Sequence, residues 1–148
     1  MARGADLAQG EVITLLASTV VGATAGTNGT AVYIAGERVV YTFILAVTAA
    51  TSEVTDTLDV YIDWSLDDTT YYNGAHFTQV LGNGGAQAFY VRFSVGETST
   101  TDIDIGADQA VSTCLPSMFG PYVRARWVEV DGGGVASSFT FSVLGYAL

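Results

Sequence analysis

The chain of 148 residues has one cysteine, one histidine and no lysine. A single cysteine, Cys114, excludes an internal disulfide and a zinc site built on several thiolates, and we expect it to be a half-buried, unreactive loop thiol. A single histidine, His76, excludes zinc and iron centres that need two or three imidazoles. A catalytic dyad or triad with a histidine base would depend on His76, and no nucleophile signature surrounds it. The sequence therefore predicts no enzyme, with no catalytic residue, metal ligand or cofactor site.

Positive charge is also scarce, because five arginines stand against fifteen acidic residues and give a net charge of −10. Such a surface repels phosphate backbones, whereas nucleic-acid affinity needs clustered positive charge. No apolar run approaches the roughly 18 residues of a membrane helix, and the N-terminus lacks the regions of a signal peptide. We expect no nucleic-acid partner and no membrane insertion. Hydrophobic residues make up 49% and charged residues 14%, which is typical of a folded domain.

Signals for long helices are missing, and short runs of β-branched and aromatic residues take their place. Turn residues rich in glycine, asparagine and aspartate separate these runs. The expected strands cover residues 11–21, 31–35, 38–47, 57–66, 71–81, 88–95, 121–130 and 137–144. The last two are expected to form a hairpin across 131–134. The pattern predicts an all-β, single-domain antiparallel β-sandwich or jelly roll of about eight strands over residues 11–148, preceded by an N-terminal arm, residues 1–10, held by a neighbour.

The clearest period of two runs through residues 57–66. Leu58, Val60, Ile62, Trp64 and Leu66 are expected to face the core, opposite Asp59, Tyr61, Asp63 and Ser65. Carboxylate pairs do serve glycosidases, but Asp59 and Asp63 lie about 13 Å apart along an extended strand. We therefore interpret them as the solvated half of an amphipathic strand.

Three further segments contain residue types that are typical of known local motifs. The acidic loop 96–108 carries Asp102, Asp104 and Asp108, whose oxygens suit calcium, although their spacing does not match the helical calcium loop and calcium binding stays open. Residues 65–71 resemble an Asp-box hairpin in which the expected glycine is replaced, so their role is turn stabilisation. The glycine-rich 82–85 is no phosphate loop, because no lysine follows and no helix begins there.

Most of the chain carries segments that resemble small structural proteins of tailed bacteriophages. These segments are Ala-Gly-Thr-Asn-Gly-Thr at 25–30, Leu-Ala-Val-Thr-Ala-Ala at 45–50, Leu-Asp-Val-Tyr-Ile-Asp-Trp-Ser-Leu-Asp at 58–67, His-Phe-Thr-Gln-Val-Leu-Gly-Asn-Gly-Gly at 76–85, Tyr-Val-Arg-Ala-Arg-Trp at 122–127 and Ser-Phe-Thr-Phe-Ser-Val at 138–143. The resemblance implies a virion component, foremost a capsid decoration (cement) protein on the outer capsid surface. It further implies a homotrimer whose partner is the major capsid protein, and it transfers no catalytic residue.

Two other functions are compatible with the same sequence. One is a head-tail connector or tail component of the virion. The other is a jelly-roll carbohydrate-binding module, which would present exposed aromatic side chains, with Tyr61, Tyr71, Tyr72 and Trp127 as candidates. A mean hydropathy of +0.37 exceeds what a solitary soluble domain usually needs. We therefore expect part of the apolar surface to be shared with copies of the chain or with partners.

Overall fold

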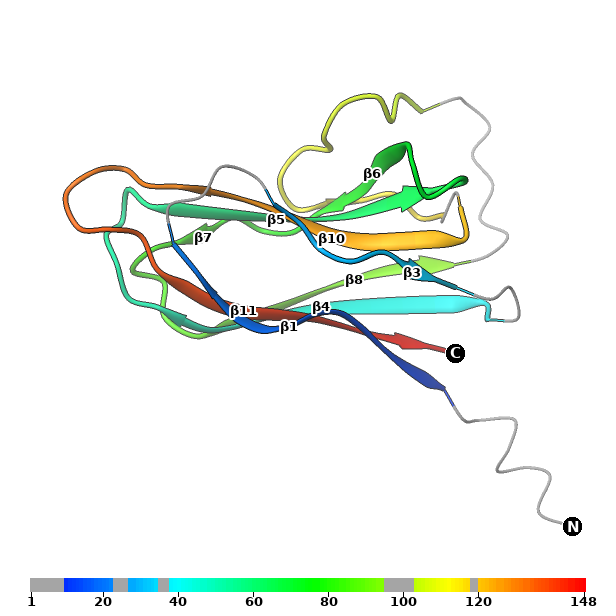
Figure 1. The fold of residues 1–148 in the computed structure, drawn as a ribbon, viewed down its shortest axis with the longest axis horizontal. Helices are drawn as coiled ribbons and strands as arrows, with labels where there is room; N and C mark the ends of the chain where they lie inside the picture. The colour runs from blue at the N-terminus through cyan, green and yellow to red at the C-terminus, as the bar shows by residue number, and fades with distance from the viewer. Residues whose placement is uncertain (1–9, 23–26, 35–37, 95–102, 118–119) are drawn as a thin grey trace, which may run out of the picture.

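The computed structural model describes residues 10–22, 27–34, 38–94, 103–117 and 120–148, and these fold into two antiparallel sheets packed face to face (Figure 1). Sheet A has the order β1 (Glu11–Val21), β11 (Phe139–Ala147), β4 (Val40–Ala50), β8 (Gln87–Ser94). Sheet B has the order β2 (Thr27–Asn28), β10 (Tyr122–Val130), β5 (Thr57–Ser65), β6 (Tyr71–His76), β9 (Thr113–Cys114). In addition, β3 (Val32–Tyr33) pairs with β10 and β7 (Val80–Leu81) pairs with β5. The described residues contain no helix, so none that could cross a membrane. The all-β prediction is confirmed.

The strand pairing is that of a jelly roll. We count β2 and β3 as one strand, because both pair with β10, and set aside the short β7 and β9. Of the eight strands that remain, the first pairs with the eighth, the second with the seventh, the third with the sixth and the fourth with the fifth. Two Greek keys rolled into a double sheet produce this nesting. The predicted sandwich of about eight strands is thus present, and its topology is resolved.

The core between the sheets is built from the inward face of each strand. Leu58, Val60, Ile62 and Trp64 are fully buried, as their alternation predicts. The ring of Trp64 meets Phe93 edge to face, with centroids 5.1 Å apart. Such pairs add to the free energy gained by area burial. Leu66 departs from the prediction, because β5 ends at Ser65 and Leu66 is 72% exposed in the turn that follows.

The last two long strands do not form the predicted hairpin. β10 lies in sheet B and β11 in sheet A, so residues 131–138 cross from one sheet to the other at the end of the sandwich. Two alternating runs joined by a glycine-rich turn occur both in a hairpin and in a connection between two sheets, so the local sequence does not distinguish the two arrangements. The short β2 also lies within 22–30, a stretch that the sequence indicated as loop.

Residues 103–117, which belong to the connection between β8 and β10, lie over the outer face of sheet B. They run across β5 and β6 in Figure 1 (yellow) and include β9, paired with β6. The expected N-terminal arm falls on residues 1–10, of which 1–9 lie outside the described residues. The amide of Gly10 donates a hydrogen bond of 3.1 Å to the hydroxyl of Tyr146.

Candidate functional site

Polar side chains on the outer face of sheet B stand in two rows that cross β10, β5 and β6. The first row is Arg124, Asp63 and Asn73, and the second is Arg126, Tyr61 and His76. Side chains directly opposite one another on neighbouring strands approach closely enough to interact. Asp63 is only 3% exposed and Asp59 is 9% exposed. The carboxylate of Asp59 is bonded to His76 and, at 2.9 Å, to Nε2 of Gln79. The interpretation of these two aspartates as a solvated strand face is therefore wrong.

Asp63 is the centre of the first row. Arg126 donates to its carboxylate through Nε at 2.8 Å, and Nη2 of Arg124 lies 3.6 Å away. Nδ2 of Asn73 donates to the other carboxylate oxygen at 3.0 Å. A buried carboxylate is stable only when it is paired and hydrogen-bonded in this way. Burial by itself would lower the pKa of Arg126, but hydrogen bonds to Asp63 and Asp108 outweigh it and raise that pKa.

His76 uses both ring nitrogens within the second row. Nε2 lies 2.8 Å from Oδ1 of Asp59, and Nδ1 lies 2.9 Å from the carbonyl oxygen of Gln109. Both ring nitrogens therefore have a hydrogen-bond partner within the chain. In this arrangement His76 joins β6 to the covering connection, with its ring 4.2 Å from that of Tyr61.

The same network fixes the covering connection to the sheet. Asp108 forms an ion pair with Arg126, and the amide of Gln109 donates to Oδ1 of Asn73 at 2.9 Å. The amide of Leu115 donates to the carbonyl of Gly74 at 2.9 Å. Residues 103–117 are therefore attached to sheet B by polar contacts.

The acids of the loop proposed for calcium point to different partners. Oδ1 of Asp104 accepts a hydrogen bond of 2.8 Å from the amide of Gly106, whereas Asp108 pairs with Arg126. Asp102 lies outside the described residues. Within the part of the chain that the structure describes, no three carboxylate, thiol or imidazole groups gather as a metal site would need.

The turn after β5 behaves as the Asp-box resemblance predicts. Oδ1 of Asp67 accepts bonds of 2.9 Å from the amides of Thr69 and Thr70, and a bond of 3.1 Å from the hydroxyl of Ser65. Asp68, which follows in the same turn, has a φ of 59°. Aspartate tolerates this left-handed conformation better than most residues. The role of the segment is turn stabilisation.

The four aromatic residues considered for carbohydrate binding do not form a common exposed surface. Tyr61 and Trp127 are buried, the latter on the core side of β10. Tyr71 lies under the guanidinium of Arg124, 3.7 Å from its ring centroid, and burial, aided by a hydrogen bond to Asp68, raises its pKa to about 12. Tyr72 alone among the four is exposed.

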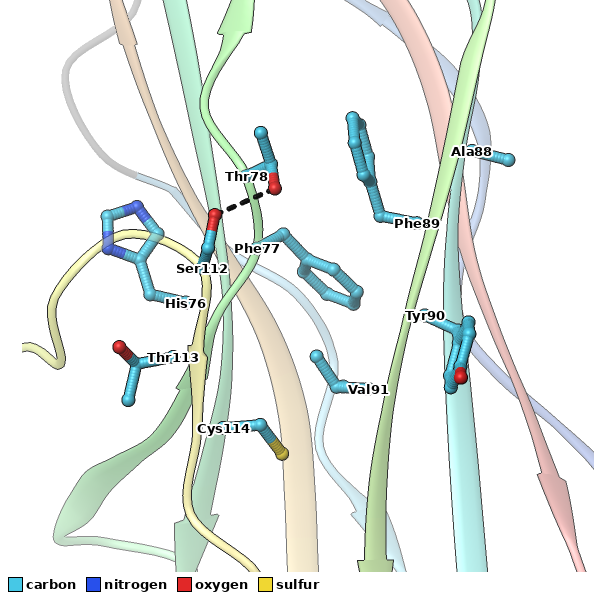
Figure 2. Close-up of a pocket in the computed structure, with 10 residues that line it drawn as sticks. All are labelled: His76, Phe77, Thr78, Ala88, Phe89, Tyr90, Val91, Ser112, Thr113 and Cys114. Atoms are coloured by element: carbon cyan, nitrogen blue, oxygen red, sulfur yellow. Dashed lines mark hydrogen bonds between the residues drawn. The ribbon is translucent and has the colours of Figure 1, made fainter.

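A cavity of about 350 Å³ opens at the side of the sandwich. Residues 88–91 of β8 line one side of it, and residues 76–78 and 112–114 line the other. Figure 2 shows Phe77, Phe89 and Val91 pointing into it, while the imidazole of His76 points away. The hydroxyls of Thr78 and Ser112 bond to each other at 2.8 Å at its margin. Burial raises the pKa of the thiol of Cys114, which also lines the cavity. The cavity suits an apolar group and brings no acid-base pair together.

Among the described residues, no segment covers the outer face of sheet A, where large apolar side chains are exposed between threonines and serines. Leu144, Ile44 and Tyr90 stand directly opposite one another on β11, β4 and β8, and all three are exposed. In the next row Val12 and Tyr146 are paired and exposed as well. The mean hydropathy predicted an apolar surface shared with other molecules, but not the sheet on which it lies. The partners of Asp63 on neighbouring strands were missed too, because they depend on strand register.

Comparison with known proteins adds a likeness of fold. No protein-family model and no curated protein matches the sequence. Among solved structures, a chain of the structure of infectious bursal disease virus, Gx strain, superposes with a TM-score of 0.54 at 13% identity. The match covers 95% of this chain and 33% of that chain, so the present chain spans about a third of the length of its structural neighbour. At this identity the likeness is one of fold, and the jelly roll described here has a counterpart in a virus structure.

Proposed function

We propose that the chain is a non-enzymatic structural protein of a virus particle. The observation that carries this proposal is the jelly-roll fold, which the chain shares over nearly its whole length with a chain of a virus structure. Jelly rolls also occur in lectins and enzymes, so the fold needs support from the surface. That support comes from His76, whose ring nitrogens are both bonded within the chain, and from the uncovered apolar face of sheet A.

Within this role, we propose decoration and stabilisation of the outer surface of a tailed-phage capsid, with the major capsid protein as partner. The resemblance of the sequence to tailed-phage structural proteins supports this choice. The net charge of −10 fits an outer position, because an acidic protein inside the shell would be repelled by packaged nucleic acid. The resemblance also favours a trimer.

The test is to add the purified chain to tailed-phage capsid shells that lack it and to image the particles. Extra density over the outer capsid surface, together with slower heat disruption of the shells, is the expected result. Density confined to the portal vertex or the tail would favour the connector or tail component instead. Failure to bind the shells combined with retention on a polysaccharide column would support the carbohydrate-binding module.

A further inference from the structure

The two outer faces of the sandwich differ in the side chains that they carry and in how far these are exposed. Sheet B holds its charged side chains beneath residues 103–117. Sheet A exposes large apolar side chains to solvent: Val12, Val20, Ile44, Tyr90, Leu144 and Tyr146, which are between 41% and 72% exposed. Strand pairing brings five of these side chains together, whereas Val20 lies farther along β1 opposite Thr140. An exposed apolar patch on a soluble protein marks an interaction site. Among the described residues, sheet A is the face without a cover.

Charge restricts what can cover sheet A. Of the fifteen acidic residues, only Glu11 lies in a strand of this sheet, at its first position and opposite the buried Ala147. Arg92 on β8 is the one basic residue in these four strands. A strongly cationic or anionic partner would therefore find almost nothing to pair with on this face. The complementary surface is nearly uncharged and combines apolar side chains with hydroxyl groups, as sheet A itself does.

We infer that the occupant is a second copy of this chain, packed sheet A against sheet A about a two-fold axis, so that the assembly is a dimer and not the trimer that the resemblance favours. Two copies that each carry a net charge of −10 repel one another. Apposing these faces removes apolar surface from water while Asp63 and Asp108 of both copies remain on the far sides. A two-fold contact uses the same patch twice, so the face must be its own complement, and a neutral apolar sheet satisfies that condition.

The size of the face is sufficient for such a contact. Strands about 4.8 Å apart with about 3.3 Å per residue give a four-stranded face of roughly 20 Å by 30 Å. That is about 600 Å² in projection, and side-chain relief raises the accessible area toward the roughly 800 Å² per partner of a standard interface. Two flat sheets pack well at about 10 Å separation. Ile44 and its neighbour Leu144 lie in the middle strands near mid-length, so the axis passes close to them.

The test uses the symmetry of the contact. Ile44→Arg and Ile44→Asp each place two like charges beside the axis, and each variant is expected to be a monomer by light scattering at about 100 µM, where a contact with a micromolar Kd would be formed. Mixed in equal amounts, the two variants are expected to form a heterodimer, because the charges then attract across the axis. Leu66→Arg is the matched control, since Leu66 is 72% exposed outside sheet A, and it should remain a dimer like the parent chain.

Tyr90→Arg replaces the variants at Ile44 if either of them fails to fold, because Tyr90 is 72% exposed and its removal leaves the core intact. It should weaken the dimer at least tenfold. A parent chain that is monomeric at this concentration, a trimer, or a variant mixture that stays monomeric would each overturn the inference. The contact does not depend on the proposed virion role: a dimer that ignores capsid shells contradicts only that role, and a shell-binding trimer contradicts only the two-fold contact.

Discussion

Replacing Asp63 with alanine should destabilise the fold strongly, because it removes the centre of the network beneath residues 103–117. Arg126 and Asn73 lose direct hydrogen bonds to the carboxylate, and Arg124 loses its ion pair. Removing one partner of a buried ion pair costs about 3–5 kcal/mol. Arg126 retains Asp108 and its side chain is 19% exposed, so we expect the lower end, about 3 kcal/mol. In a domain of this size that lowers the Tm by about 6–12 °C.

Urea denaturation followed by tryptophan fluorescence measures this change, because Trp64 and Trp127 are both buried and report on the core. Asp104→Ala is the control, since Asp104 is exposed and its described bond stays within its own turn. It should shift the free energy of unfolding by less than about 0.5 kcal/mol. A loss of under about 1 kcal/mol for Asp63→Ala would show that the network is not the attachment we describe.

A double-mutant cycle separates this interaction from the general cost of truncation. Asp63→Ala combined with Arg126→Ala should be less destabilising than the sum of the two single variants, with a coupling of about 1–3 kcal/mol. Additive effects would mean that the 2.8 Å contact between these side chains contributes nothing to stability.

Three further predictions concern local contacts. Gly74→Ala should cost about 1–3 kcal/mol in thermal denaturation, because the new methyl group would lie 2.5 Å from Cδ1 of Trp64; an unchanged Tm would contradict the close packing. The pKa of Asp56 is held below its ordinary value, mainly by the hydrogen bond from the amide of Gly132. The ionised carboxylate therefore stabilises the fold at a pH above the pKa of the unfolded state, and this stabilisation is lost as pH falls through the pKa of the folded state. Asp56→Asn should flatten the decline of Tm below about pH 4; parallel curves of Tm against pH for parent and variant would refute this. The thiol of Cys114, its pKa raised by burial, should react with a disulfide reagent more slowly than free cysteine at pH 8 and accelerate in urea, whereas equal rates would place it in solvent.

Fold class was predictable because alternation is a local property of the chain. The stretch 57–66 predicted which side chains of β5 meet the core, and the structure confirms Leu58, Val60, Ile62 and Trp64. The same pattern could not say what covers the other face. Asp59 and Asp63 look solvated to any local rule, yet both are buried and bonded to residues that are distant in the sequence, Asp59 to His76 and Asp63 to Arg126.

By itself, the sequence determined the all-β class, the turn chemistry of Asp67 and the scarcity of residues for histidine or cysteine chemistry. Each of these follows from composition or from neighbours within a few residues. The tertiary structure alone decided that β10 and β11 belong to different sheets, that the aspartates of β5 are buried, and that the exposed apolar side chains gather on sheet A. These depend on which strands pair and in what register, and pairing between distant segments leaves no mark in the local pattern of residues.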